Sequence, residues 1–312
     1  MFDHLKPNVL WALGGVIAVL VLASVIVAVL AAVRRDKDYG ELKLRMRSWW
    51  WMVGIFAAAM LLSPTAAVVF WGFVSFLALK EYLSLIPTRR ADRRVLFWAY
   101  LAIPIHYYWA GIAWYGMFVI FIPVFMFLLL PLRMVTIGET QGFLRAAGTL
   151  HWGMMAMVFS ISHLAYLLVL DPAKNAAGAG AGLLLYLVFL TQFNDVAQYT
   201  WGKLFGKHKV IPKVSPKKTW EGLIGGILTT LALAVLIAPY LTPLRLLEAI
   251  GAGLIIGVFG FIGDVTISAV KRDIGVKDSG TLIPGHGGVL DRVDSLTYTA
   301  PLFFHYVYYL HY

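Results

Sequence analysis

Long apolar segments alternate with short polar ones along this chain. The first apolar segment, 9–33, carries no charged residue and is long enough to cross a bilayer about 30 Å thick. No small-residue cleavage site followed by polar sequence comes after it, so we predict a retained helix and not a signal peptide. The run at 49–86 is too long for one span and is interrupted at Ser63 and Pro64, which predicts a helical hairpin.

The later apolar runs predict further membrane helices. A second hairpin is expected over 95–132, with its turn near Gly111. Single helices are then expected over 148–170, 183–200, 223–241, 249–270 and 296–312. The pattern predicts an all-α polytopic membrane protein with about ten transmembrane helices, which form a single integral membrane domain over 1–312.

Basic residues are confined to alternate loops. Most of the 26 Lys and Arg residues fall in 34–47, 87–94, 133–145, 203–218 and 271–292. The exceptions are Lys6, Lys174 and Arg245, with Lys80 near a helix end. The positive-inside rule therefore predicts that these five loops face the cytoplasm and that both termini lie outside.

Composition limits the class of protein. Hydrophobic residues make up 60% of the chain and charged residues 13%, which is too apolar for a soluble core. The absence of cysteine excludes disulfides, a thiolate nucleophile and cysteine-bound zinc. In a polytopic protein the net charge of +10 reflects basic loops beside anionic lipid headgroups, so we expect no nucleic-acid partner.

The stretch 268–294 concentrates polar chemistry between two apolar runs. It offers cations for anionic oxygens and carboxylates of the kind that Mg²⁺ prefers. These are Lys271, Arg272, Lys277 and Arg292, and Asp273, Asp278, Asp291 and Asp294. His286 lies among Gly285, Gly287 and Gly288, where the backbone can approach a ligand closely. The composition is that of a phosphate and metal site.

Two acidic positions lie in apolar runs, where a carboxylate is costly and therefore a functional candidate. Asn194 and Asp195 form the first position, and Asp264 the second. Asp264 shares a helix face with Ser268 and Lys271. The alternatives are a structural hydrogen bond between helices for the first position and a carboxylate paired with a nearby basic residue for the second.

The segment 215–222 reads SPKKTWEG and precedes another apolar run. Ser215 and Thr219 can cap the next helix, whose N-terminal amides favour an anion, while Lys217 and Lys218 add charge for a triphosphate. The alternative is a basic loop followed by a helix cap. The segment lacks the glycine spacing of a Walker A loop. Elsewhere, Glu81 and Glu139 are single acids near helix ends, and no partner is predicted for either.

These segments together resemble the signature of the phosphatidate cytidylyltransferases, the CDP-diacylglycerol synthases. The resemblance rests on Ser268, Lys271-Arg272, Lys277-Asp278, Pro284, His286-Gly287-Gly288 and Asp291-Arg292-x-Asp294. It extends to Asn194-Asp195, to Gly202 through Lys207, and to 215–222. One departure is Gln198, which stands between Ala197 and Tyr199, so no role is carried onto this tyrosine.

The resemblance implies a bacterial inner-membrane enzyme of phospholipid biosynthesis that joins CTP to phosphatidic acid and releases pyrophosphate. It implies a cytoplasmic active site in the catalytic half, about 181–312, after N-terminal helices over about 9–170. Mg²⁺, alone or with a second cation, is expected on Asp264 and Asp291, with Asp195 added as a third ligand. A homodimer is also implied.

Residue roles follow from the same resemblance. The expected catalytic residues are Asp264, Lys271, Arg272, His286, Asp291 and Arg292. The expected substrate-binding residues are Asn194, Ser215, Lys217, Lys218, Thr219, Glu221, Ser268, Lys277, Asp278, Gly287, Gly288 and Asp294. For His286 two roles stay open, a general base or a hydrogen bond to phosphate.

The same residues are compatible with other functions. A CDP-archaeol synthase or a CTP-dependent lipid kinase would share the nucleotide chemistry but differ in the lipid or in the phosphorus attacked. A transporter or channel could use the intramembrane aspartates for ions. Such a path should show acids at several depths, whereas the acids here cluster at one face.

Overall fold

The computed structural model describes residues 4–33 and 38–312, which fold almost entirely into helices. The helices are α1 (Pro7–Val33), α2 (Gly40–Leu62), α3 (Pro64–Leu85), α4 (Arg93–Gly111), α5 (Tyr115–Ile120), α6 (Phe127–Val135), α7 (Phe143–Gly153), α8 (Ser160–Leu168), α9 (Ala179–Phe205), α10 (Trp220–Leu241), α11 (Leu246–Asp273), α12 (Leu290–Val293) and α13 (Leu296–His311). Two π-helical segments, Phe121–Met126 and Met154–Phe159, join α5 to α6 and α7 to α8. Within the described ranges there is no strand, which confirms the all-α prediction.

Both predicted hairpins are confirmed. Ser63 ends α2 and caps α3, where its side chain accepts a hydrogen bond from the Ala66 amide at 3.0 Å. Pro64 is the first residue of α3, a position that needs no amide hydrogen. The second hairpin turns immediately after Gly111, between α4 and α5.

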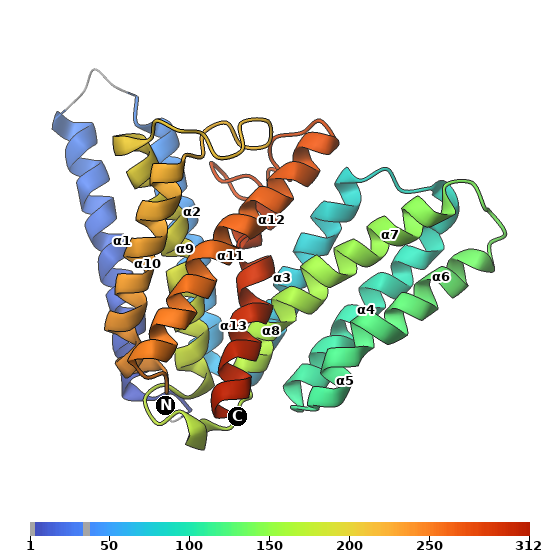
Figure 1. Ribbon diagram of the computed structural model, residues 1–312, viewed down its shortest axis with the longest axis horizontal. Coiled ribbons are helices and arrows are strands. Elements are labelled where there is room, and N and C mark those ends of the chain that lie inside the picture. The colour runs from blue at the N-terminus through green and yellow to red at the C-terminus, as the bar shows by residue number, and fades with distance from the viewer. Residues whose placement is uncertain (1–3, 34–37) are drawn as a thin grey trace.

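The helices run alternately in opposite directions. Within residues 4–33 and 38–312, seven helices or continuous helical segments are long and apolar enough to cross a membrane. The loops that follow α3, α6, α9 and α11 gather at one end, the upper end in Figure 1, while α1 begins and α13 ends at the other. Residues 34–37 of the first basic loop lie outside the described residues. The count of ten crossings and the cytoplasmic side stay predictions.

Helices α9, α10 and α11 pack closely and position the site. Glycine allows this at the lower end of α9, where a Cβ on Gly178 would lie 2.6 Å from the Leu241 carbonyl oxygen of α10. A Cβ on Gly182 would overlap the same oxygen. Close approach through small residues is the usual packing of helices in a bilayer, where no hydrophobic force separates protein from lipid. In Figure 1, α9 and α10 run side by side, whereas α11 leans away from them toward its upper end, where the loop 206–219 meets it.

Candidate active site

The polar segments singled out in the sequence meet at the upper end of the bundle. The C-terminal end of α9, the loop 206–219 before α10, and the end of α11 with the loop 274–289 and α12 all lie there (Figure 1). Small isolated bridges close these loops, between Lys209 and Thr219 and between Ile283 and Gly287. Tertiary structure thus brings together segments that are almost a hundred residues apart.

A cavity of about 410 Å³ opens between α9, the loop 206–219, α10 and α11. Four lysines and two carboxylates line it, together with Ser215 and Thr219. The charged residues are Lys203, Lys209, Lys217, Lys218, Asp195 and Asp264. The cavity therefore combines cations for a polyphosphate with carboxylates for a metal ion.

Asp264 is already paired in the structure. Its Oδ2 atom lies 2.6 Å from the Lys218 Nζ atom, and its Oδ1 accepts a hydrogen bond from the Ser268 hydroxyl at 3.1 Å. The Lys218 ammonium also lies 4.5 Å from the centre of the Phe261 ring. Both side chains are only partly exposed, so the pair is better shielded from water than a surface salt bridge.

The lysine-bearing loop 206–219 is fixed by polar contacts at both ends. Thr219 caps α10 and accepts a hydrogen bond from the Gly222 amide at 3.2 Å, which confirms it as the helix cap. Glu221 accepts hydrogen bonds from the backbone amides of Lys207 and His208. Arg272 of α11 donates from Nε to the Val214 carbonyl at 3.3 Å. Glu221 and Arg272 therefore shape the cavity wall.

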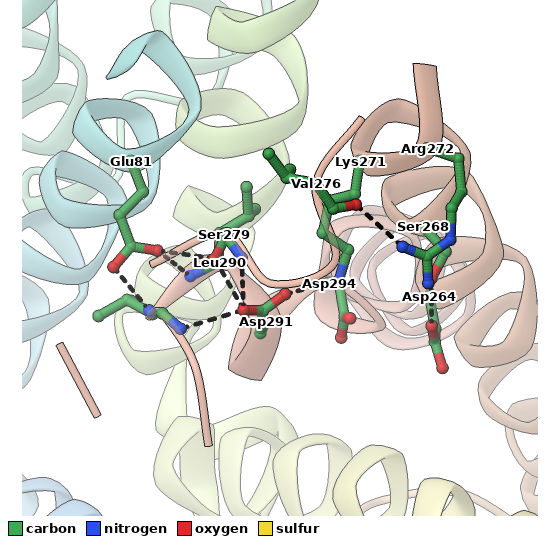
Figure 2. Close-up of polar contacts among 12 residues, drawn as sticks. Glu81, Asp264, Ser268, Lys271, Arg272, Val276, Ser279, Leu290, Asp291 and Asp294 are labelled. Atoms are coloured by element: carbon green, nitrogen blue, oxygen red, sulfur yellow. Dashed lines mark hydrogen bonds and ion pairs between the residues drawn. The ribbon is translucent and has the colours of Figure 1, made fainter. Parts of the chain in front are cut away.

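A second cluster forms around Asp291 (Figure 2). Lys271 Nζ lies 2.6 Å from Asp291 Oδ1, and both side chains are buried. Asp291 Oδ2 accepts three further hydrogen bonds, from the Ser279 amide, the Ser279 hydroxyl and the Gly288 amide. Burial alone would raise the pKa of Asp291, but the hydrogen bonds from Lys271 and Gly288 hold that pKa below its usual value.

Glu81 of α3 completes this cluster, although the sequence predicted no partner for it. Its carboxylate accepts hydrogen bonds from the Val289 and Leu290 amides, both at 2.8 Å, and from the Ser279 hydroxyl at 3.1 Å (Figure 2). These donors lie about two hundred residues away in the chain, so no local pattern could reveal the contact.

The glycines of the loop allow the carboxylates to come this close. Gly287 has a φ of +82°, which favours glycine, and a Cβ there would overlap Asp291 Oδ2. A Cβ on Gly288 would overlap Glu81 Oε2. The sequence predicted that these glycines admit a ligand; in the structure the groups that approach them are the protein's own carboxylates.

The other acidic candidates lie around Ser295, which follows α12. The Ser295 hydroxyl donates to Asp195 at 3.0 and 3.2 Å, and the Ser295 amide donates to Asp294 at 2.8 Å. Burial raises the pKa of Asp294, and the carboxylates of Asp264 and Asp195 raise it further. Asp195, Asp264 and Asp294 therefore lie close enough to repel one another.

The fit to a metal ion differs among the three predicted ligands. Within 4–33 and 38–312, no three acidic or histidine side chains converge in a coordinating arrangement. Asp195 and Asp264 face one cavity, so both could reach an ion there once Lys218 moves from Asp264. Asp291 fits less well, because its two oxygens already accept four donor groups.

The remaining predicted residues have varied surroundings. Asn194 is buried between helices, where it accepts from the Thr230 hydroxyl and donates to the Gly257 carbonyl, the structural arrangement weighed as its alternative. Lys277 and Asp278 are exposed in the loop. His286 packs edge-on against Trp49 of α2, and burial followed by the charge of Arg292 lowers its pKa.

The fold and these clusters define a polytopic membrane protein with a polar, lysine- and aspartate-rich site at one end of its helices. The comparisons with known proteins agree with this class. The model of the cytidylyltransferase family matches residues 43–310, and the chain belongs to that family. It is a nucleotidyltransferase enzyme.

Individual relatives fall into two groups. The uncharacterized protein YnbB of Escherichia coli K12 is 46% identical over 298 residues, which cover 96% of this chain and 98% of YnbB. The phosphatidate cytidylyltransferase of Haemophilus influenzae is 47% identical over 135 residues, 42% of this chain and 46% of that protein. The phosphatidate cytidylyltransferase of Staphylococcus aureus COL is 40% identical over 124 residues, which cover 39% of this chain and 48% of that protein. The chain thus matches about half the length of these two enzymes.

Proposed function

We propose that the protein is a phosphatidate cytidylyltransferase that converts CTP and phosphatidic acid into CDP-diacylglycerol and pyrophosphate. The observation that carries the proposal is the cavity in which four lysines and two carboxylates meet at the loop-rich end of the bundle. Family membership and the named relatives support the nucleotide chemistry. The site would face the cytoplasm of a bacterial inner membrane, where CTP is present.

In the proposed reaction, a phosphate oxygen of the lipid attacks the α-phosphorus of CTP. A new P–O bond forms while the bond between the α-phosphorus and its bridging oxygen to the β-phosphate breaks, and pyrophosphate leaves. Both reactants are anions, so their repulsion is the main barrier, and fixed cations lower it. Lys203, Lys209, Lys217 and Lys218 would bind the triphosphate from the cavity wall.

The remaining residues would hold these groups in place. Asp264 and Asp195 would hold Mg²⁺, which supplies positive charge to the phosphates when bound. Lys218 neutralises Asp264 in the structure, and incoming phosphate would draw Lys218 away from it. The Lys271–Asp291 pair would set the shape of the loop 274–289. No protein nucleophile is required.

The test is an assay with the purified protein and CTP labelled either at the α- or at the γ-phosphate. Phosphatidate as acceptor should give lipid labelled from α-labelled CTP, together with one pyrophosphate per lipid. Label transferred from the γ-phosphate would indicate a lipid kinase. Activity only with an isoprenoid ether phosphate lipid would indicate a CDP-archaeol synthase. No transfer to either lipid, with ion flux in vesicles instead, would overturn the enzyme proposal in favour of a transporter.

A further inference from the structure

A second cavity, of about 750 Å³, lies between α2, α3 and residues 282–296. Its lining along α2 extends from Leu44 to Phe56, about 18 Å at 1.5 Å per residue. One end is polar, with Arg47 and Ser48 of α2 and Arg292 of α12. The other end is apolar, with residues such as Ile55 and Phe73. A molecule that fills this cavity must itself be charged at one end and apolar at the other.

The second cavity lies directly beside the lysine-rich one. Gln192 lines the second cavity and Asp195 lines the first, and the two residues are one turn apart on α9. Gln192 donates a hydrogen bond to the Arg292 carbonyl at 3.1 Å. Ser295, three residues after Arg292, donates to Asp195. One turn of α9 and the segment 292–295 are therefore the boundary between the two cavities.

At the polar end, neither Arg47 nor Arg292 forms a salt bridge with a carboxylate of the described residues, although the charge of Arg292 acts on the nearby Asp195 and Asp294. The Nε atom of Arg292 is buried and has no hydrogen-bond partner among the described residues. The Nδ1 atom of His286, in the loop beside this end, is also buried without a partner there. A buried donor without a partner costs about 1–3 kcal/mol. A phosphate group at this end would accept from Arg292 and lie beside Arg47.

We propose that this cavity binds the phospholipid substrate, with its phosphate at the end lined by Arg47 and Arg292 and its acyl chains along α2 and α3. The assignment rests on the proposed function, which requires the lipid phosphate to reach the nucleotide. It makes Arg47, which lies in the N-terminal half of the chain, a lipid-binding residue. The rival occupants are bulk membrane lipid, bound without preference for a headgroup, and a second copy of this chain.

Two charge-removing variants separate the two substrate sites. Arg47→Gln should raise the KM for phosphatidate by about tenfold, the effect of one lost charge-assisted hydrogen bond, and leave the KM for CTP within about twofold. Lys218→Gln should raise the KM for CTP by about tenfold and leave the KM for phosphatidate within about twofold. Equal effects of Arg47→Gln on both KM values, or none on either, would overturn the assignment of Arg47.

A bulky side chain tests the apolar end. Val74 of α3 lines the cavity, whereas Val69 is 64% exposed on the same helix and does not line it. Val74→Trp should raise the KM for dioleoyl phosphatidate by about tenfold and that for dihexanoyl phosphatidate by less than about threefold. Val69→Trp, the matched control, should change neither. Identical behaviour of the two variants would contradict acyl-chain binding in this cavity.

A measurement without turnover keeps the inference independent of the reaction. Protein in phosphatidylcholine nanodiscs is mixed with a phosphatidate that carries a photoreactive acyl chain, and cross-linked peptides are identified by mass spectrometry. We expect labels in 44–56 and 70–77 that excess phosphatidate removes and excess phosphatidylcholine does not. Labels removed equally by both lipids would show bulk lipid and overturn the proposal.

The same experiment separates this proposal from the proposed function. Specific labels without any CTP-dependent product would retain the lipid site and reject the reaction. Product formation with labels only outside these ranges would retain the reaction and reject the site. Cross-links between two protein copies through 44–56 would identify the second copy as the occupant and reject the lipid.

Discussion

At the scale of single residues, Asp264 and Asp291, both predicted from the sequence to bind Mg²⁺, have different partners. Asp264 faces the lysine-rich cavity, and one of its oxygens is paired with Lys218. Asp291 is buried, and both of its oxygens accept hydrogen bonds from the protein. The first arrangement can exchange a lysine for an ion, whereas the second holds a loop in shape. Their replacements should therefore fail in different ways.

Asp264→Asn removes the charge from the cavity but little packing. We expect turnover to fall by about a hundredfold or more, with the melting temperature nearly unchanged. Asp291→Asn leaves the Lys271 ammonium buried without its counter-charge and should destabilise the protein by about 3–5 kcal/mol. The double variant Lys271→Met/Asp291→Asn should recover part of that stability. Thermal unfolding and initial rates of the three purified variants check this; equal melting temperatures for both single variants would contradict it.

His286 should make the protein less stable against unfolding as the pH falls. Burial and the nearby charge of Arg292 lower its pKa in the folded protein from the ordinary value of about 6.5. As the pH falls below about 6.5, the unfolded chain therefore binds a proton at this histidine more readily than the folded protein does. The contribution of neutral His286 to stability is fully present above about pH 6.5 and is lost as the pH falls toward the folded pKa. His286→Gln should remove this part of the dependence. Melting temperatures of the wild type and the variant from pH 5 to 8 measure this effect. If the two curves of melting temperature against pH run parallel, His286 does not cause the pH dependence.

At the scale of elements, a single carboxylate connects α3 to the loop 274–289. Glu81 accepts from the Val289 and Leu290 amides at the start of α12, and from Ser279. Ser48 of α2 adds a hydrogen bond to the Pro284 carbonyl at 2.7 Å. The loop 274–289 is thus held by the N-terminal helices as well as by the C-terminal part of the chain. The two halves predicted from the sequence, about 9–170 and about 181–312, therefore both contribute contacts to this loop.

Glu81→Gln should loosen the loop without unfolding the bundle. The amide retains the shape but loses the negative charge, so the three hydrogen bonds weaken by about 1.5–3 kcal/mol in total. Amide exchange over 279–291 should become faster by about tenfold or more, while exchange in α9 stays unchanged. Glu139→Gln is the matched control, since Glu139 is exposed and its carboxylate accepts only from the Gln141 amide among the described residues. Equal exchange in both variants would count against the anchoring role.

At the scale of the whole molecule, the arrangement of the helices agrees with the charge pattern. The basic loops gather at one end, and α1 begins and α13 ends at the other (Figure 1). The positive-inside rule predicts that the basic end faces the cytoplasm. This orientation would give both cavities access to cytoplasmic CTP and to lipid of the inner leaflet.

Because the chain has no native cysteine, single cysteines can report its orientation. Lys174, Lys209 and Thr281 are all exposed. Lys174 belongs to the segment between α8 and α9, at the lower end in Figure 1, and the other two belong to the loops 206–219 and 274–289 at the upper end. An impermeant thiol reagent applied to intact cells should label only the cysteine at position 174. All three should react once the membrane is opened. Labelling at 209 or 281 in intact cells would reverse the orientation and separate the site from cytoplasmic CTP.

The sequence by itself determined the helices and the types of residue that meet at the upper end of the bundle. Apolar runs of membrane length leave the backbone only helical hydrogen bonds in a bilayer, so the hairpins at Ser63 and Gly111 could be predicted from local pattern. The charged and glycine-rich segments likewise identified the residues that meet at the upper end, because charges are excluded from the apolar runs.

Only the tertiary structure decided which of these charged residues contact one another. Carboxylate partners depend on how helices pack, so the Lys218–Asp264 and Lys271–Asp291 pairs could not be distinguished from metal ligands in sequence. Glu81 lacked any local signal, since its donors lie about two hundred residues further along the chain. The cavity beside Arg47 also requires α2 to lie next to α12, which no period or spacing specifies. Local patterns follow from hydrogen bonding and solvation along the backbone, whereas these contacts follow from the packing of distant surfaces.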